Sequence, residues 1–120
     1  MGARFPGVDP QTWRRYATRL WIEGPDGLDL RYDPALRDAM LENAASAAPD
    51  AWPLFNALSG MPVAILRGEN SDLLSRETLR AMQDAHPGAI AAEVPDRGHV
   101  PFLDEPESLA LMSRFLERVS

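Results

Sequence analysis

Residues 62–99 decide the fold, and they read PVAILRGENSDLLSRETLRAMQDAHPGAIAAEVPDRGH. The stretch opens with a continuous apolar run at 62–67, which has the length of a buried strand. Ser75 then suits a helix N-cap, and the apolar spacing after it predicts a helix over 76–85. A second strand is predicted at 89–94. The pattern is therefore strand, loop, helix, strand, loop.

This alternation predicts two parallel strands joined by a right-handed crossover helix. A last helix follows at about 106–119, for which Asp104 is the expected N-cap. That helix carries an apolar stripe formed by Leu109, Met112, Phe115, Leu116 and Val119. The 62–119 half is thus predicted to be an α/β layer structure.

Two polar residues follow the predicted strands at equal distances. Asp72 lies five residues after Arg67, and His99 lies five after Val94. Parallel strands end at the same edge and lie only about 4.8 Å apart, so the two side chains can meet there. A carboxylate that holds one imidazole nitrogen leaves the other nitrogen free to act as a general base. Glu69 is a rival acid in the same loop.

At these residues the sequence resembles the α/β-hydrolase family. The matching motifs are RGENSD at 67–72 and GHVPFLDEP at 98–106. The resemblance implies that Asp72 is the acid of a catalytic triad and that His99 is its histidine. It also implies a division into a helical, cap-like segment at 1–48 and the C-terminal α/β-hydrolase core segment at 49–120.

One part of the family pattern is missing from the chain. The nucleophile elbow, Gly-x-Ser-x-Gly, should precede the acid, and none of the seven serines has those surroundings. Two parallel strands alone also leave both outer edges of the sheet unpaired. The sequence therefore predicts a fold that is incomplete by itself and that self-associates or docks on a companion chain.

The first half of the chain is punctuated by capping residues and turns. Asp9-Pro10 opens a predicted helix at 10–22, and Asp33-Pro34 opens another at about 34–46. Between them, 21–23 and 28–32 can pair as a short hairpin around Pro25-Asp26-Gly27. Asp50 is expected to cap a short helix that carries Trp52 and Phe55 and that Gly60 ends.

Composition excludes several classes of function. The 120 residues carry a net charge of −6, which disfavours nucleic acid as a partner. The chain has no cysteine, so disulfides and thiolate metal sites are excluded. It has no apolar run long enough to span a membrane and no signal-peptide pattern. We expect a cytoplasmic protein with a small-molecule substrate and with no cofactor, metal, nucleic-acid or membrane partner.

Other conspicuous residues have simpler interpretations. His86 suits the C-terminal end of its helix, and Arg97 is expected to be solvated. Two histidines 13 residues apart, with no acidic partner at helical spacing, do not form a metal site. The remaining aromatic residues are expected to pack in the core or against the cap, and a share of them can line an acyl pocket: Trp13, Tyr16, Trp21 and Trp52.

Two functions remain. The first is hydrolysis of an ester, amide or related bond by a Ser-His-Asp triad, with Asp72 and His99 in this chain and the serine outside it. The resemblance makes the chain a hydrolase by family, but without a nucleophile the isolated 120 residues are expected to be inactive. The alternative is a non-catalytic fragment or an oligomerising interaction module.

Overall fold

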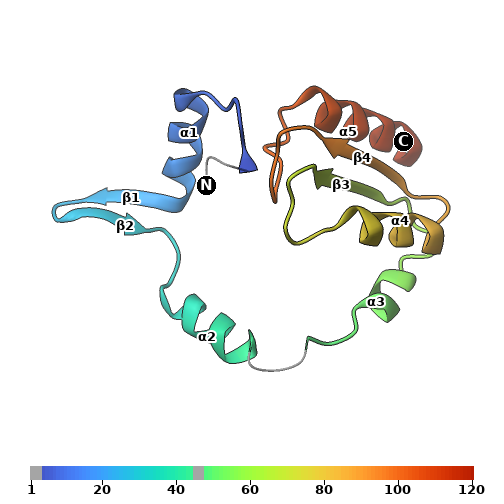
Figure 1. The fold of residues 1–120 in the computed structure, drawn as a ribbon, viewed down its shortest axis with the longest axis horizontal. Helices are drawn as coiled ribbons and strands as arrows, with labels where there is room; N and C mark the ends of the chain where they lie inside the picture. The colour runs from blue at the N-terminus through green and yellow to red at the C-terminus, as the bar shows by residue number, and fades with distance from the viewer. Residues whose placement is uncertain (1–3, 45–47) are drawn as a thin grey trace. The chain divides into compact units, whose positions relative to one another are not determined.

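The computed structural model describes residues 4–44 and 48–120. The chain forms two compact units, one of Met1–Gly7 with Ala51–Ser120 and the other of Val8–Asp50. Figure 1 shows the ribbon coloured from blue at the N-terminus to red at the C-terminus. The division expected at 48/49 stays a prediction. The structure groups the residues before Val8 with the later unit, which the sequence did not predict.

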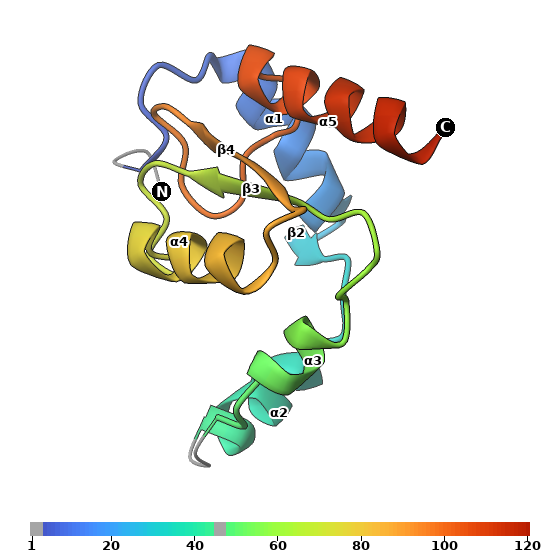
Figure 2. The same cartoon turned by 90° about the vertical axis from the view of Figure 1, so that its right-hand side faces the viewer.

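The later unit is built on a two-stranded parallel sheet. Its elements in chain order are α3 (Trp52–Asn56), β3 (Ala64–Gly68), α4 (Arg76–Ala85), β4 (Ile90–Val94) and α5 (Pro106–Val119). The register pairs Ala64 with Ile90 and Gly68 with Val94. Figures 1 and 2 show α4 on one side of the strand pair and α5 on the other. This arrangement confirms the predicted α/β class and its strand-helix-strand-helix order.

The crossover helix α4 has the bounds that its sequence predicts. The Ser75 hydroxyl accepts a hydrogen bond from the Thr78 backbone N–H at 3.0 Å, which satisfies one of the free donors of the first turn. Leu79 is buried from this helix. The local Ser75 cap explains why this element could be located from sequence alone.

The N-cap positions expected for Asp50 and Asp104 are wrong. Helix α3 begins after Ala51, whose backbone is already helical (φ −89°, ψ −5°). Helix α5 begins after Glu105, whose backbone is extended (φ −73°, ψ 150°), and Pro106 follows at the start of the helix. Proline has no N–H and a fixed φ, so it suits the first helical position and moves the cap to the residue just before it.

The core of the described residues is small. Its buried apolar side chains are Ile65, Leu79, Ile90, Val94 and Leu111. Helix α5 buries Ser108 and Leu111, while most of its predicted apolar stripe stays exposed. The exposed fractions are 50% for Leu109, 37% for Met112, 59% for Leu116 and 49% for Val119. Much of the apolar surface of this helix is therefore uncovered.

In the described part of the unit of Val8–Asp50, the chain forms two helices and a hairpin. Its elements are α1 (Pro10–Leu20), β1 (Trp21–Gly24), β2 (Gly27–Leu30) and α2 (Ala35–Ala44). The two strands are antiparallel, which confirms the predicted hairpin. Asp9 caps α1 by accepting from the Gln11 and Thr12 backbone N–H groups. The end expected for the second helix, at 46, lies outside the described residues.

None of the helices in the described ranges is both long and apolar enough to cross a membrane.

Candidate active site

The loops that follow β3 and β4 lie side by side. Beyond the strands, the Glu69 N–H donates to the Val94 carbonyl at 2.9 Å, and the Asn70 N–H donates to the Arg97 carbonyl at 2.8 Å. The backbone of the acid loop is therefore joined directly to that of the histidine loop. Asp72 and His99 stand in these two loops, at the carboxyl end of the strand pair where ligands bind in open α/β sheets.

Two glycines allow this close approach. A Cβ atom on Gly68 would overlap the carbonyl oxygens of Gly98 and Arg97. A Cβ atom on Gly98 would lie 2.8 Å from the Phe5 ring and 3.1 Å from the Arg4 Cβ. Gly98 therefore leaves room for the segment before α1, which packs against the histidine loop.

Asp72 is ionised and exposed, and it pairs with Arg4. The Arg4 Nη1 forms an ion pair with the Asp72 Oδ2, and both side chains are about half exposed. The hydrogen bond from Arg4 is the largest cause that lowers the pKa of Asp72 below its ordinary value of 3.8, and the charge of His99 also lowers it. His99 is thus near enough to interact electrostatically with the Asp72 carboxylate.

The structure brings Asp72 and His99 to one edge without a hydrogen bond between them. Within residues 4–44 and 48–120, the Asp72 carboxylate pairs with Arg4, and the exposed His99 ring has no hydrogen-bond partner. The imidazole is therefore free to meet a group from elsewhere.

Residues 4–6 form a strap across the two loops, which no sequence pattern predicted. The Arg4 carbonyl accepts from the Asn70 side chain at 3.3 Å. The Phe5 ring stacks on Phe102, with centroids 5.4 Å apart and planes inclined by 24°. The Pro6 carbonyl accepts from Arg97 at 3.4 Å. These contacts link positions more than 60 residues apart, which local sequence patterns do not report.

Glu69, the rival acid, is engaged in structural contacts. Its carboxylate pairs with Arg76 at 3.3 Å and accepts from the Asp96 backbone N–H at 3.2 Å. Arg76 also pairs with Glu93 at 2.6 Å, and Glu93 in turn pairs with the buried Arg67 at 2.5 Å. Glu69 therefore braces the two loops, and Asp72 is the better candidate for the acid.

Sequence reasoning missed Glu105 and misjudged Arg97. Arg97 was expected to be solvated, but its side chain is only 19% exposed and pairs with Glu105 at 3.0 Å. Glu105 is 5% exposed. A sequence signal was available, because Glu105 directly precedes Pro106 and lies three residues before Ser108, the spacing of a side-chain contact at a helix start.

His86 takes the structural position that its sequence suggested. It is the C-cap of α4, and its Nε2 lies 3.1 Å from the Leu58 carbonyl oxygen. It is far along the chain from the two loops, at the amino end of β4. Across residues 4–44 and 48–120, no group of three or more His, Asp or Glu side chains is placed to hold a metal ion.

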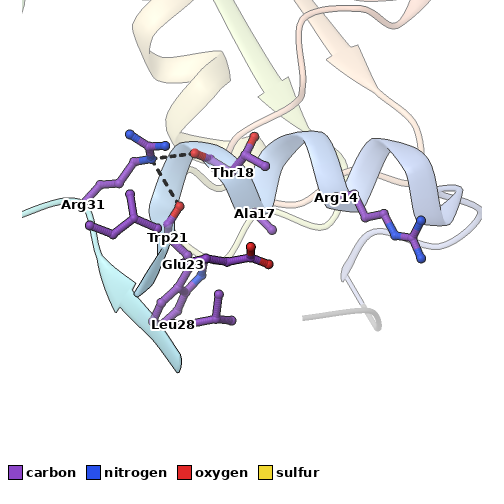
Figure 3. Close-up of a pocket in the computed structure, with 8 residues that line it drawn as sticks. Arg14, Ala17, Thr18, Trp21, Glu23, Leu28 and Arg31 are labelled. Atoms are coloured by element: carbon purple, nitrogen blue, oxygen red, sulfur yellow. Dashed lines mark hydrogen bonds between the residues drawn. The ribbon is translucent and has the colours of Figure 1, made fainter. Parts of the chain in front are cut away.

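The unit of Val8–Asp50 contains an open cavity of about 680 Å³ between α1 and the hairpin. Figure 3 shows the side chains that line it, with Arg31 beside the hairpin and Arg14 farther along α1. The Arg31 Nε donates to the carbonyls of Thr18 at 2.6 Å and Trp21 at 3.2 Å, which fixes the helix to the hairpin. Of the aromatic residues considered for an acyl pocket, Trp21 is one that lines this cavity.

Comparison with known proteins shows that the chain resembles hydrolases over part of their length. No protein-family profile matches the sequence. The 3-hydroxybutyrate-oligomer hydrolase of Cupriavidus necator is 35% identical over 123 aligned residues, which cover 96% of this chain and 42% of that protein. An α/β hydrolase from Novosphingobium aromaticivorans is 42% identical, with a TM-score of 0.82 over 98% of this chain and 41% of its own.

A third protein supports the fold alone. The E-2-(acetamidomethylene)succinate hydrolase is 23% identical, with a TM-score of 0.69 over 97% of this chain and 42% of that one. The chain thus spans about two fifths of the length of these relatives. Together with the parallel strand pair and its two crossover-linked loops, the likeness shows that the chain is similar to α/β hydrolases and has the fold of a C-terminal portion of such a protein.

Proposed function

We propose that this chain contributes the acid and the histidine of a hydrolase that cleaves ester or related bonds with a Ser-His-Asp triad. Asp72 orients His99 and stabilises the imidazolium, and His99 takes the proton of a serine and then returns it to the leaving group. The serine comes from polypeptide outside these 120 residues. The observation that carries the proposal is the placement of both side chains on hydrogen-bonded loops at the carboxyl end of β3 and β4.

Esters are the first substrate class to test. The Cupriavidus relative is a hydrolase of 3-hydroxybutyrate oligomers, whose units are joined by ester bonds. The isolated 120 residues should turn over p-nitrophenyl acetate no faster than buffer, because they lack a recognised nucleophile. Clear turnover that His99→Ala abolished would show that the nucleophile lies within the chain, and would overturn that part of the proposal.

A chimera tests the proposal directly. Residues 1–120 would replace the matching 41% of the Novosphingobium hydrolase, which leaves that protein's remaining chain to complete the fold. The chimera should hydrolyse p-nitrophenyl esters, and His99→Ala or Asp72→Asn should lower kcat by about 10³-fold or more. Glu69→Gln is the matched control and should cost less than about tenfold, because Glu69 braces the loops without being the acid. Equal losses for Asp72→Asn and Glu69→Gln would contradict the role of Asp72.

The second candidate is a non-catalytic module that assembles with further polypeptide. Among the described residues, β3 and β4 pair only with each other, so each leaves an outer edge open, and α5 exposes Leu109 and Leu116. In the module, a second copy of the chain would cover these surfaces, whereas in the hydrolase the rest of the fold would cover them. Sedimentation of the isolated chain distinguishes the two cases: a stable, monodisperse dimer favours the module, and weak polydisperse association favours an unfilled hydrolase interface.

A further inference from the structure

The histidine loop is closed by the buried side chain of Glu105. His99 itself makes no hydrogen bond among the described residues, so its place depends on how the loop around it is anchored. Three of the four donors to Glu105 come from this loop and the fourth comes from the first turn of α5. Glu105 Oε1 accepts from Arg97 Nε at 3.0 Å and from the Phe102 N–H at 2.8 Å. Its Oε2 accepts from the Leu103 N–H at 3.0 Å and from the Ser108 hydroxyl at 2.7 Å.

The contacts require an ionised carboxylate. Burial raises the pKa of Glu105, but the hydrogen bonds from Phe102, Ser108 and Arg97 outweigh it and leave the pKa below its usual range. Three of the four partners, Arg97 Nε and two backbone N–H groups, can only donate, and a carboxylate can accept from all four. A glutamine would turn its amide N–H toward a backbone N–H and leave that donor buried and unpaired.

The anchored residues flank His99 on both sides. Arg97 precedes it by two positions and Phe102 follows it by three. The Arg97 guanidinium also lies over the Phe102 ring, 5.6 Å from its centroid, which closes the loop on itself. Leu103 is held with a positive φ of 68°, a conformation that its branched side chain disfavours and that its hydrogen bond to Glu105 helps to maintain.

One of these anchors continues into the acid loop. The Arg97 carbonyl accepts from the Asn70 N–H at 2.8 Å, two residues before Asp72. Glu105, through Arg97, is therefore linked to the backbone that carries Asp72. A shift of the histidine loop would move His99 relative to Asp72, and misplacement by about 1 Å can cost about 10²-fold in rate.

We propose that Glu105 is a positioning residue, whose carboxylate fixes the histidine loop so that His99 stays beside Asp72. The importance of this for catalysis rests on the proposed function. The placement of the loop by Glu105 is independent of the proposed function, and it can be measured in a chain that has no activity.

The absence of cysteine allows a direct measurement of the separation of the two loops. In an Asp72→Cys, His99→Cys variant, the equilibrium with glutathione gives the effective concentration of the two thiols. Adding Glu105→Gln should lower that effective concentration about tenfold. Glu107→Gln is the control, because it removes a carboxylate from the first turn of the same helix without touching the loop; it should leave the value unchanged.

A spectroscopic measurement uses the native histidine. In the folded chain, Asp72→Asn should shift the ring ¹H–¹³C signal of His99, and in a Glu105→Gln background the same change should shift it much less. If Glu105→Gln does not fold, Arg97→Met removes one anchor while keeping contact with Phe102, and it should lower the effective concentration about threefold. Unchanged values in a folded Glu105→Gln or Arg97→Met chain would overturn the proposal.

The chimera separates this inference from the proposed function. With Glu105→Gln, kcat should fall while KM changes little, and the effective concentration in the cysteine pair should fall in parallel. A chimera that is inactive with its wild-type residues, combined with a Glu105-dependent effective concentration, would remove the proposed function and leave the positioning of the loop intact.

Discussion

Arg4 pairs with Asp72 at the carboxyl end of β3, and this ion pair joins two residues that the sequence holds far apart. The carboxylate proposed to orient His99 is thus already held by a cation from the strap of residues 4–6. A carboxylate has several lone pairs, so it can accept from a guanidinium and from an imidazole at once. Arg4 can therefore fix the direction of the carboxylate while His99 approaches it.

Replacing Arg4 should raise the pKa of Asp72. The hydrogen bond from Arg4 is the largest cause of its depression, so Arg4→Gln should return the pKa toward 3.8. The ¹³C signal of the Asp72 carboxyl group, followed as a function of pH, measures this change. Arg14→Gln is the control, since Arg14 belongs to the unit of Val8–Asp50. An unchanged pKa in Arg4→Gln would mean that the ion pair does not persist in solution.

A methyl group at position 68 should destabilise the later unit. The Cβ of Gly68→Ala would overlap backbone carbonyls, which cannot rotate away as a side chain can, so the free energy of unfolding should fall by about 2–3 kcal/mol. Urea unfolding measures the loss. Gly88→Ala is the matched control, because its nearest neighbour would be the His86 ring at an ordinary 3.5 Å. Similar losses for the two variants would argue against a close approach at Gly68.

Much of the fold could be predicted because the deciding signals are local. The Ser75 cap and the turn at 25–27 act within a few residues, and both elements lie where the sequence placed them. The errors at Asp50 and Asp104 arose because an acidic residue close to a helix start suits the N-cap, and the sequence pattern does not show whether the helix begins at the next residue or one residue later. In α5, Pro106 takes the first helical position, so the N-cap is Glu105 and not Asp104.

The candidate site was only partly predictable, because some of its contacts are local and others join distant segments. Parallel strands end together, so the sequence could place Asp72 and His99 at one edge. The strap residue Arg4 could not be foreseen, because its contacts depend on how two distant segments pack. Arg97 was expected to be solvated and Glu105 was given no role, since composition does not reveal that four donors converge on one buried carboxylate.

The strap should loosen when its aromatic contact is removed. Phe5 stacks on Phe102 and lies against Gly98. Phe5→Ala should therefore expose the peptide bond after Arg4 and increase its rate of cleavage by trypsin roughly fivefold. Mass spectrometry of the digestion follows that bond separately from other sites. Phe55→Ala is the control, because this ring packs edge-on against Trp52 instead. Equal cleavage in both variants would show that Phe5 does not hold the strap.

Glu93 should make the free energy of unfolding of the later unit depend on pH in the acidic range. Hydrogen bonding from Arg76, and then from Arg67, lowers the pKa of Glu93 below its ordinary 4.5, although partial burial opposes this. A lowered folded-state pKa stabilises the protein above about pH 4.5, and that stability is lost as the pH falls through the folded-state value.

Glu93→Gln leaves Arg67, only 6% exposed, without its charged partner. The free energy of unfolding at pH 7 should therefore fall by about 2 kcal/mol and change less between pH 5 and pH 3. Urea unfolding across this range tests both effects, with Glu69→Gln as a control that keeps the Arg67 pair; a pH dependence as steep as that of the wild type would contradict the prediction.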